Sequence, residues 1–164
     1  KYQEDYPYLN PLFTFAVPGY NVRSTELNAV VGLSQLTRLD DNIAKRTENL
    51  NFWVASLDKE KYQTNFALEG SSNFSLPLIL SKKDDILFDK VKSLLEKSKI
   101  EFRLGTAGGG NQSRQPYLEK FEGQYVSYKT PHLDHIHSYG LYIGNHTEVN
   151  RDQIEQLCSL LNDL

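Results

Sequence analysis

The sequence predicts an α/β protein in which helices cover a small sheet and one long helix precedes it. Apolar residues recur at helical spacing from Leu27 to Leu57. The runs 74–80 and 139–144 instead alternate apolar with other side chains, as strands do when one face is buried. Helical and strand patterns alternate along the chain, which favours a sheet covered by helices.

The composition is that of one ordinary globular domain. The chain has 164 residues, a formal net charge of −3 and a single cysteine. A domain of this size buries roughly 70% of the surface of its unfolded chain, so it needs neither disulfides nor a structural metal to fold.

The same totals argue against nucleic acid and membranes as partners. Lys and Arg are scattered, so they create no positive field that would attract a phosphate backbone. No apolar run reaches the length of a membrane span, and the first residues do not resemble a signal peptide. We expect a cytoplasmic protein. Since the sequence starts at Lys1 and contains no methionine, we also expect it to be part of a longer chain.

Residues 1–20 combine aromatic residues with prolines and show neither a helical nor a strand period. We interpret them as an extended aromatic arm. It either lies across its own domain or covers a partner subunit or a ligand.

The long helix is expected to begin near Ser24 or Thr25, either of which can cap its N-terminus, with Glu26 favouring the helix dipole. A single helix to Leu57 would be roughly 50 Å long. A break near Asp40–Asp41 is the alternative.

A β-α-β unit follows. The run 74–80 predicts a strand, and Pro77 places it at an edge of the sheet. Asp84 or Asp85 then caps a helix, and 100–104 reads as the next strand.

The remainder is expected to hold a short helix over 115–121, the strand 139–144 and a last helix. Asn150, with Gln153 three residues on, is a capping box for that helix. Cys158 falls among its apolar residues, so we expect a buried, unreactive thiol.

A glycine-rich loop, GTAGGGNQSRQP (105–116), leaves the end of the second strand of this unit. Glycines let backbone N–H groups approach a ligand, although neither the Walker spacing nor the dinucleotide fingerprint is present. Asn111, Arg114 and Gln115 offer donors and acceptors for sugar hydroxyls, and Arg114 can also pair with a phosphate or carboxylate. The alternative is a flexible surface connection.

All four histidines lie between 132 and 146. In an extended segment His135 and His137 would share a face, but Asp134 would point away, and no cysteine lies nearby, so we expect no metal site. The interpretation that we keep beside this one is a single histidine that contacts a ligand or transfers a proton. Solvated loop residues are the default.

Asn21 and Arg23 stand just before the N-terminus of the long helix, where unpaired N–H groups and the helix dipole favour an anion. An arginine at such a position is otherwise simply solvated.

The stretch GYNVRSTELNAVVGLSQL (19–36), with Leu39–Asp40 and Lys45–Arg46 after it, resembles a motif of the DegT/DnrJ/StrS family of pyridoxal-phosphate nucleotide-sugar aminotransferases and dehydratases. The segments 110–116 and 139–146 resemble segments found in the family branch that contains the 4-keto-6-deoxyhexose 3-dehydratases.

This resemblance implies the C-terminal small domain of a fold-type-I transferase that depends on pyridoxal 5'-phosphate (PLP). The segments would be 1–23, the arm and active-site segment; 24–58, the connecting helix; and 59–164, the small α/β domain. No catalytic residue is expected here, because the Schiff-base lysine, or the histidine that replaces it, would lie outside this chain.

The resemblance also implies a homodimer whose active site lies at the subunit interface. Asn21 and Arg23 would bind the cofactor. Substrate contacts, including the loop that borders the nucleotide-sugar pocket, would come from a larger set: Tyr20, Asn111, Arg114, Gln115 and His137.

The implied function is amino transfer to a nucleotide-linked keto-deoxysugar, with a donor such as glutamate, or dehydration at C3, in cell-surface polysaccharide or deoxysugar biosynthesis. The alternatives are a non-catalytic module that binds a sugar or nucleotide, and a dimerisation module. The 164-residue chain alone is expected to be inactive.

Overall fold

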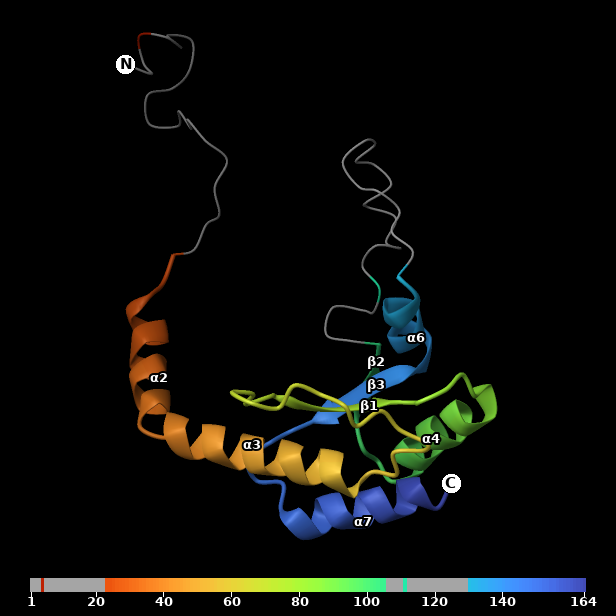
Figure 1. Cartoon of the computed structure of the whole chain (residues 1–164). Helices are drawn as coiled ribbons and strands as arrows, with labels where there is room; N and C mark the ends of the chain where they lie inside the picture. Colours follow the sequence, from red (N-terminus) through yellow and green to blue (C-terminus); the bar gives the residue numbers. More distant parts are fainter. Residues whose placement is uncertain (1–3, 5–22, 106–110, 112–129) are drawn as a thin grey trace. The chain divides into compact units, whose positions relative to one another are not determined.

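A computed structural model describes residues 4, 23–105, 111 and 130–164 (Figure 1). They fall into two compact units, one up to Arg38 and one from Leu39 to Leu164. None of the helices in these ranges is long and apolar enough to cross a membrane. The elements are α2 (Glu26–Leu36), α3 (Leu39–Ser56), β1 (Ser75–Ile79), α4 (Asp85–Lys97), β2 (Phe102–Leu104), α6 (Pro131–Tyr139), β3 (Gly140–Gly144) and α7 (Arg151–Asn162).

The sheet has three strands, and the last of them in the sequence lies in the middle. β3 pairs with β1 on one side and with β2 on the other, antiparallel in both cases. β1 and β2 are therefore parallel to each other, and β1–α4–β2 is a β-α-β unit split by β3. The predicted β-α-β unit and the edge position of β1 are both confirmed.

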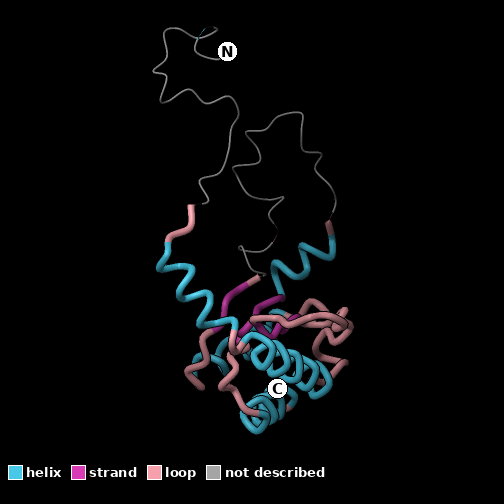
Figure 2. Tube along the Cα trace, turned by 90° about the vertical axis from the view of Figure 1, so that its left-hand side faces the viewer, coloured by secondary structure: helices cyan, strands magenta, loops and turns pink. Residues whose placement is uncertain are grey.

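Side chains alternate between the two faces of the sheet along each strand, and one of these faces packs against the helices. Leu76 of β1 and Ile143 of β3 are directly paired and buried. The next pair, Pro77 and Tyr142, points to the opposite face and is only half-buried. Helices α3, α4 and α7 all contribute to the core cluster that covers the first face (Figures 1 and 2).

Two helices that lie side by side, α3 and α7, form most of this cover (Figure 1). Trp53 of α3 is fully buried, and its Nε1 donates to the Pro77 carbonyl at 2.7 Å. α7 begins at the predicted capping box, in which the Asn150 side chain accepts from the Gln153 N–H and the Gln153 side chain accepts from the Asn150 N–H. The apolar stripe of α7, with Cys158 in it, is buried as expected.

The expectation of one continuous helix to Leu57 is wrong, because α2 and α3 are separated at Thr37 and Arg38. The Thr37 hydroxyl donates to the Ser34 carbonyl at 2.9 Å, and the Arg38 N–H donates to the Gln35 carbonyl at 3.0 Å. These local bonds end α2. The alternative expectation, a break near Asp40–Asp41, is confirmed, since the break lies just before these residues. Asp40 and Asp41 occupy the first turn of α3, where the helix dipole favours acidic side chains.

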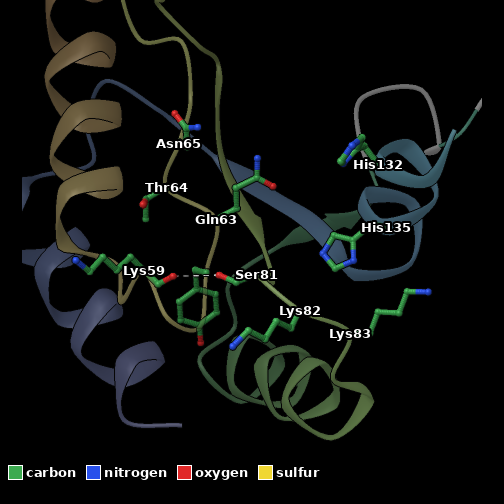
Figure 3. Close-up of a pocket in the computed structure, with 10 residues that line it drawn as sticks. Lys59, Gln63, Thr64, Asn65, Ser81, Lys82, Lys83, His132 and His135 are labelled. Atoms are coloured by element: carbon green, nitrogen blue, oxygen red, sulfur yellow. Dashed lines mark hydrogen bonds between the residues drawn. The ribbon is translucent and has the colours of Figure 1, made fainter.

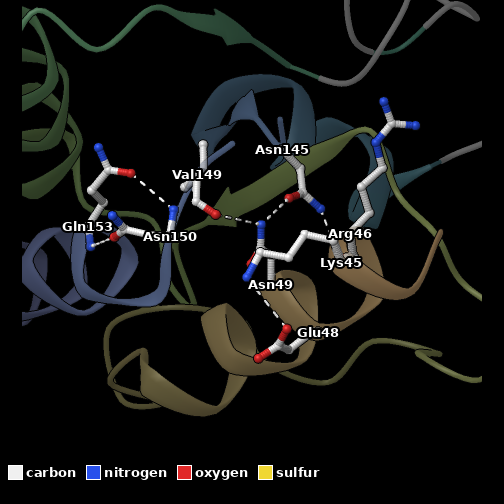
Figure 4. Close-up of polar contacts among 8 residues, drawn as sticks. All are labelled: Lys45, Arg46, Glu48, Asn49, Asn145, Val149, Asn150 and Gln153. Atoms are coloured by element: carbon white, nitrogen blue, oxygen red, sulfur yellow. Dashed lines mark hydrogen bonds and ion pairs between the residues drawn. The ribbon is translucent and has the colours of Figure 1, made fainter. Parts of the chain in front are cut away.

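Two buried asparagines connect α3 to the turn after β3 (Figure 4). Asn49 and Asn145 are each 2% exposed, and Asn49 Nδ2 donates to Asn145 Oδ1 at 3.1 Å. Asn145 Nδ2 in turn donates to the carbonyls of Arg46 and Asn73 at 3.0 and 2.8 Å. One side chain therefore joins α3, the segment before β1 and the end of β3.

We predict that Asn145→Ala lowers the free energy of unfolding by about 2–4 kcal/mol, since it leaves several buried polar groups without partners. Urea denaturation measures this change. The matched control is Asn51→Ala, because Asn51 is exposed on the same helix as Asn49. We expect the control to change stability by no more than about 0.5 kcal/mol. Equal effects of the two substitutions would contradict the proposed role of the network.

Two core groups resist ionisation. The Tyr62 hydroxyl donates to the Leu161 carbonyl at 2.8 Å, and burial, with the nearby Asp58 carboxylate, raises the pKa of Tyr62 to about 12. Burial likewise raises the pKa of the Cys158 thiol to about 12. Cys158 is thus the buried, protonated thiol that the sequence predicted.

These two pKa values predict a loss of stability in alkali. Unfolding returns both groups toward pKa values of 10.0 and 9.0, so above about pH 9 the folded state holds protons that the unfolded state has lost. The free energy of unfolding should be unaffected by these groups below that pH and should fall as the pH approaches about 12.

Urea denaturation across this range, repeated on Tyr62→Phe, tests the alkaline loss. The substitution should reduce the fall, at a cost of about 1–3 kcal/mol near neutral pH from the unpaired Leu161 carbonyl. Tyr142→Phe, on the opposite face of the sheet, should keep the full fall. If the free energy of unfolding of Tyr62→Phe fell with pH as steeply as that of the unmodified protein, this explanation would be wrong.

Candidate functional site

Arg23 lies just ahead of α2. The helix is capped by Thr25, whose Oγ1 accepts from the Asn28 N–H at 3.3 Å, and Glu26 occupies the first turn. Arg23 is exposed, and among the described residues its guanidinium has no ion-pair or hydrogen-bond partner. Its guanidinium is therefore accessible, and the predicted contact with an anion stays a prediction. Its sequence neighbours in the predicted site, Tyr20 and Asn21, lie outside the described residues.

A separate cluster of predicted site residues is built around Asn111, which is only 2% exposed. The chain leaves β2 at Gly105, which has a φ of 70° and whose N–H donates to the Gly140 carbonyl at 2.7 Å. Asn111 Nδ2 donates to Thr130 Oγ1 at 2.9 Å and to Asp134 Oδ1 at 2.8 Å. The Asn111 N–H donates to His137 Nδ1 at 3.1 Å.

These three partners of Asn111 belong to α6 or its cap, a helix that the sequence interpretation missed. His132 to His137 were treated as extended or as loop residues; that is wrong. Pro131 occupies the first turn, where its missing N–H costs nothing, and the Asp134 N–H donates to the Thr130 carbonyl at 2.9 Å. The Thr-Pro pair was the available signal, but the apolar stripe of this short helix is weak.

The hydrogen bonds of this cluster determine the tautomer of His137 and the orientation of the Asn111 side-chain amide. A histidine nitrogen that accepts an N–H bond is unprotonated, so neutral His137 carries its proton on Nε2. Both amide protons of Asn111 are directed at acceptors, one of them charged, which makes that bond stronger than a neutral one. Two predicted site residues, Asn111 and His137, are thus brought together. Thr130 and Asp134 are the site residues that the sequence did not single out.

Arg114 and Gln115 lie outside the described residues, as do most of the glycine-rich loop, the expected helix over 115–121 and the aromatic arm.

Two further histidines make contacts of their own, away from Asn111. His135 Nε2 lies 2.6 Å from the Leu80 carbonyl, while His146 Nδ1 accepts from the Glu148 N–H at 3.2 Å. Within the described ranges, no three His, Cys, Asp or Glu side chains gather as a metal ion would require.

Comparison with known proteins gives one consistent match. The sequence model of the DegT/DnrJ/EryC1/StrS aminotransferase family matches residues 3–162. The chain is 29% identical over 151 residues to a GDP-4-keto-6-deoxy-D-mannose 3-dehydratase of Yersinia pseudotuberculosis, covering 91% of this chain and 38% of the relative. It is 27% identical over 151 residues to the lipopolysaccharide biosynthesis protein RfbH of Salmonella typhimurium, covering 90% and 34%.

The structure is similar as well. The solved structure of the E. coli GDP-4-keto-6-deoxy-D-mannose-3-dehydratase with bound hydrated PLP matches with a TM-score of 0.76 and 26% identity, over 92% of this chain and 38% of that one. The chain therefore spans about two fifths of the length of these relatives, and the predicted α/β fold, that of a PLP-dependent transferase, is confirmed.

The Asn111 cluster predicts the tautomer of His137. Two-dimensional ¹⁵N–¹H spectra of the histidine rings should show the Nε2–H form for neutral His137, because Nδ1 accepts from Asn111. His132 is the control, because it has no hydrogen-bond partner among the described residues and should populate both tautomers. A dominant Nδ1–H form of His137 would contradict the geometry.

Proposed function

This chain belongs to the DegT/DnrJ/EryC1/StrS aminotransferase family, and on this premise we propose that it forms the C-terminal part of a PLP-dependent enzyme that acts on a nucleotide-linked keto-deoxysugar. The observation that carries the proposal is the match to a GDP-4-keto-6-deoxy-D-mannose 3-dehydratase over 91% of this chain. The match favours dehydration at C3 over amino transfer, and RfbH points to lipopolysaccharide as the destination of the sugar.

The apolar surface of α2 supports a larger protein. Its residues Leu27, Val30, Val31, Leu33 and Leu36 are 60–77% exposed, and α2 has no buried residue. Exposed apolar surface on this scale marks a contact with further protein. In our proposal the remaining three fifths of the enzyme, or its partner in a homodimer, covers this helix.

Among the described residues, Arg23 is the one suited to bind the phosphate of the cofactor. Arg23 is exposed, unpaired within the described part of the chain and close to the N-terminus of α2, where backbone N–H groups also favour an anion. In our proposal Arg23 and Asn21 hold this phosphate. When bound, PLP supplies the electron sink for bond breaking at the sugar, and the protein supplies orientation and proton transfer.

We assign the sugar nucleotide to the residues around the 105–116 loop. In this proposal Tyr20, Arg114 and Gln115 contact the substrate. Asn111 and His137 belong to the same proposed set, and the hydrogen bond between them holds both in place. A glutamate donor, a homodimer, a cytoplasmic location and the division of the chain at 1–23, 24–58 and 59–164 stay predictions, although 24–58 holds two helices rather than one.

Borohydride reduction of the natural-length polypeptide with PLP, read by intact mass and peptide mapping, tests the proposal. The dehydratase assignment predicts bound cofactor without a covalent label, because no lysine would hold it. A labelled lysine would indicate an aminotransferase instead. Absence of bound PLP would overturn the enzyme assignment, and the 164-residue chain alone should have no activity.

The same protein tests Arg23. Loss of one charged phosphate contact removes about 1.5–3 kcal/mol of binding, so Arg23→Ala should weaken PLP binding at least about tenfold. Arg38→Ala is the matched control, because Arg38 is also exposed and follows the same helix. Equal PLP affinity in the two variants would remove Arg23 from the cofactor site.

A further inference from the structure

Arg46 of α3 carries a buried nitrogen that lacks a hydrogen-bond partner. Its Nε is buried, and the Nε–H finds no acceptor among the described residues. In the non-exposed residues of these ranges, every other buried side-chain nitrogen or oxygen has a partner. A guanidinium does not lose its proton in proteins, so this N–H is always present. Arg46 therefore differs from the other buried polar groups that the structure describes.

An unpaired N–H is costly where water cannot reach it. A buried donor without an acceptor costs about 1–3 kcal/mol, and more when the group is charged. The lysines that line a cavity of about 640 Å³ beside α6 are different. Lys59, Lys82 and Lys83 are exposed, and Figure 3 shows their ammonium groups pointing away from one another. Water can satisfy these three groups, whereas the Arg46 Nε–H needs an acceptor that is brought to it.

Helix α3 supplies no carboxylate to this group. The four positions one turn away from Arg46 are Asn42, Ile43, Asn49 and Leu50. Glu48 is two positions from Arg46, which places it about 200° around the helix. Its Oε2 lies 3.5 Å from Lys45 Nζ. The acceptor for Arg46 must therefore come from another segment.

The side chain of Arg46 also turns away from the buried asparagines. Its backbone carbonyl accepts from Asn145 Nδ2 at 3.0 Å, but Figure 4 shows the side chain extending past Asn145, with the guanidinium apart from the other residues drawn. Asn145 Oδ1 accepts from Asn49 Nδ2 instead. The polar network of the core thus leaves this guanidinium to a partner outside it.

An exposed aromatic residue is a neighbour of Arg46 in the fold. The Asn145 N–H donates to the Phe74 carbonyl at 2.8 Å, so Asn145 joins the backbones of Phe74 and Arg46. Phe74 is 56% exposed, and its ring meets that of Tyr142 edge to face, with the centroids 6.0 Å apart. Aromatic residues and arginine are enriched in protein interfaces. An apolar and a charged group that both lack cover therefore occur together at the start of β1.

We propose that Arg46 and Phe74 form a contact surface for a segment of the natural-length polypeptide outside residues 1–164, and that this segment places an Asp or Glu carboxylate on Arg46. The Nε–H and one Nη–H of a guanidinium point the same way and match the two oxygens of a carboxylate. The inference rests on the proposed function, in which this chain is one part of a longer enzyme. It spans 38% of the length of the Yersinia dehydratase.

Carbodiimide cross-linking of Arg46→Lys in the natural-length protein identifies the partner. The substitution keeps the positive charge, and the reagent joins an amine to a carboxylate in contact with it through an amide bond, with loss of water. Peptide mapping should show a link from position 46 to an Asp or Glu of the same polypeptide, outside residues 1–164. Lys45 and Glu48, 3.5 Å apart, are the internal positive control. The unmodified protein should give the control link and none at position 46.

Urea denaturation of Arg46→Met shows whether the contact stabilises the protein. Removal of one partner of a buried ion pair is strongly destabilising, so the urea midpoint of the natural-length protein should fall by about 1 M or more. Lys45→Met, which removes a neighbouring and partly exposed charge, should change the midpoint by no more than about 0.3 M. If Arg46 has no acceptor, Arg46→Met removes an unpaired buried donor, and the midpoint should rise.

A midpoint that rises or stays unchanged in Arg46→Met, or the absence of a link at position 46, would overturn the proposal. A link to residues 1–22 or 106–129 would place the acceptor within this chain, and a link at the mass of two polypeptides would place it in a second copy. Either result also overturns the proposal. Neither measurement depends on PLP, so this proposal and the proposed function can fail independently of each other.

Discussion

The described fold depends on the insertion of β3 between β1 and β2. Every strand pairing in the sheet involves β3, so the parallel strands of the β-α-β unit come together only through it. β3 also connects the core with the candidate site. Asn145, the first residue after it, bonds to α3, and α6, directly before it, carries the partners of Asn111.

The direct passage from α6 into β3 requires Gly140. A Cβ at this position would lie 2.5 Å from the Ile136 carbonyl oxygen, a backbone atom that cannot move without disturbing α6. The helix can therefore end one residue before the strand begins. This short connection ties the positions of Asp134 and His137 to the register of the sheet, so the site is placed by an element of the core.

Local patterns in the sequence were sufficient for several elements, but not for α6, for the exact break between α2 and α3, or for the assembly of the sheet. The alternation in 74–80 and the capping box at Asn150 predicted β1 and α7, because both signals depend on neighbouring residues. The central place of β3 and the bond between Asn111 and Asp134 join distant residues, and no periodicity reports such pairs. The family was found from motif resemblance, and PLP came with the family, since none of the described residues identifies a cofactor by itself.

The stability of α2 gives a separate physical argument for a larger assembly. Isolated helices shorter than about 12–15 residues are marginal in water, and α2 has 11 residues, none of them buried. Its Thr25 cap contributes only about 1 kcal/mol. Burial of each large apolar side chain would add about 1.5–3 kcal/mol, so a covering surface can supply several times the energy of the cap. The exposed apolar surface of α2 is therefore the surface of a helix that gains stability when other protein covers it.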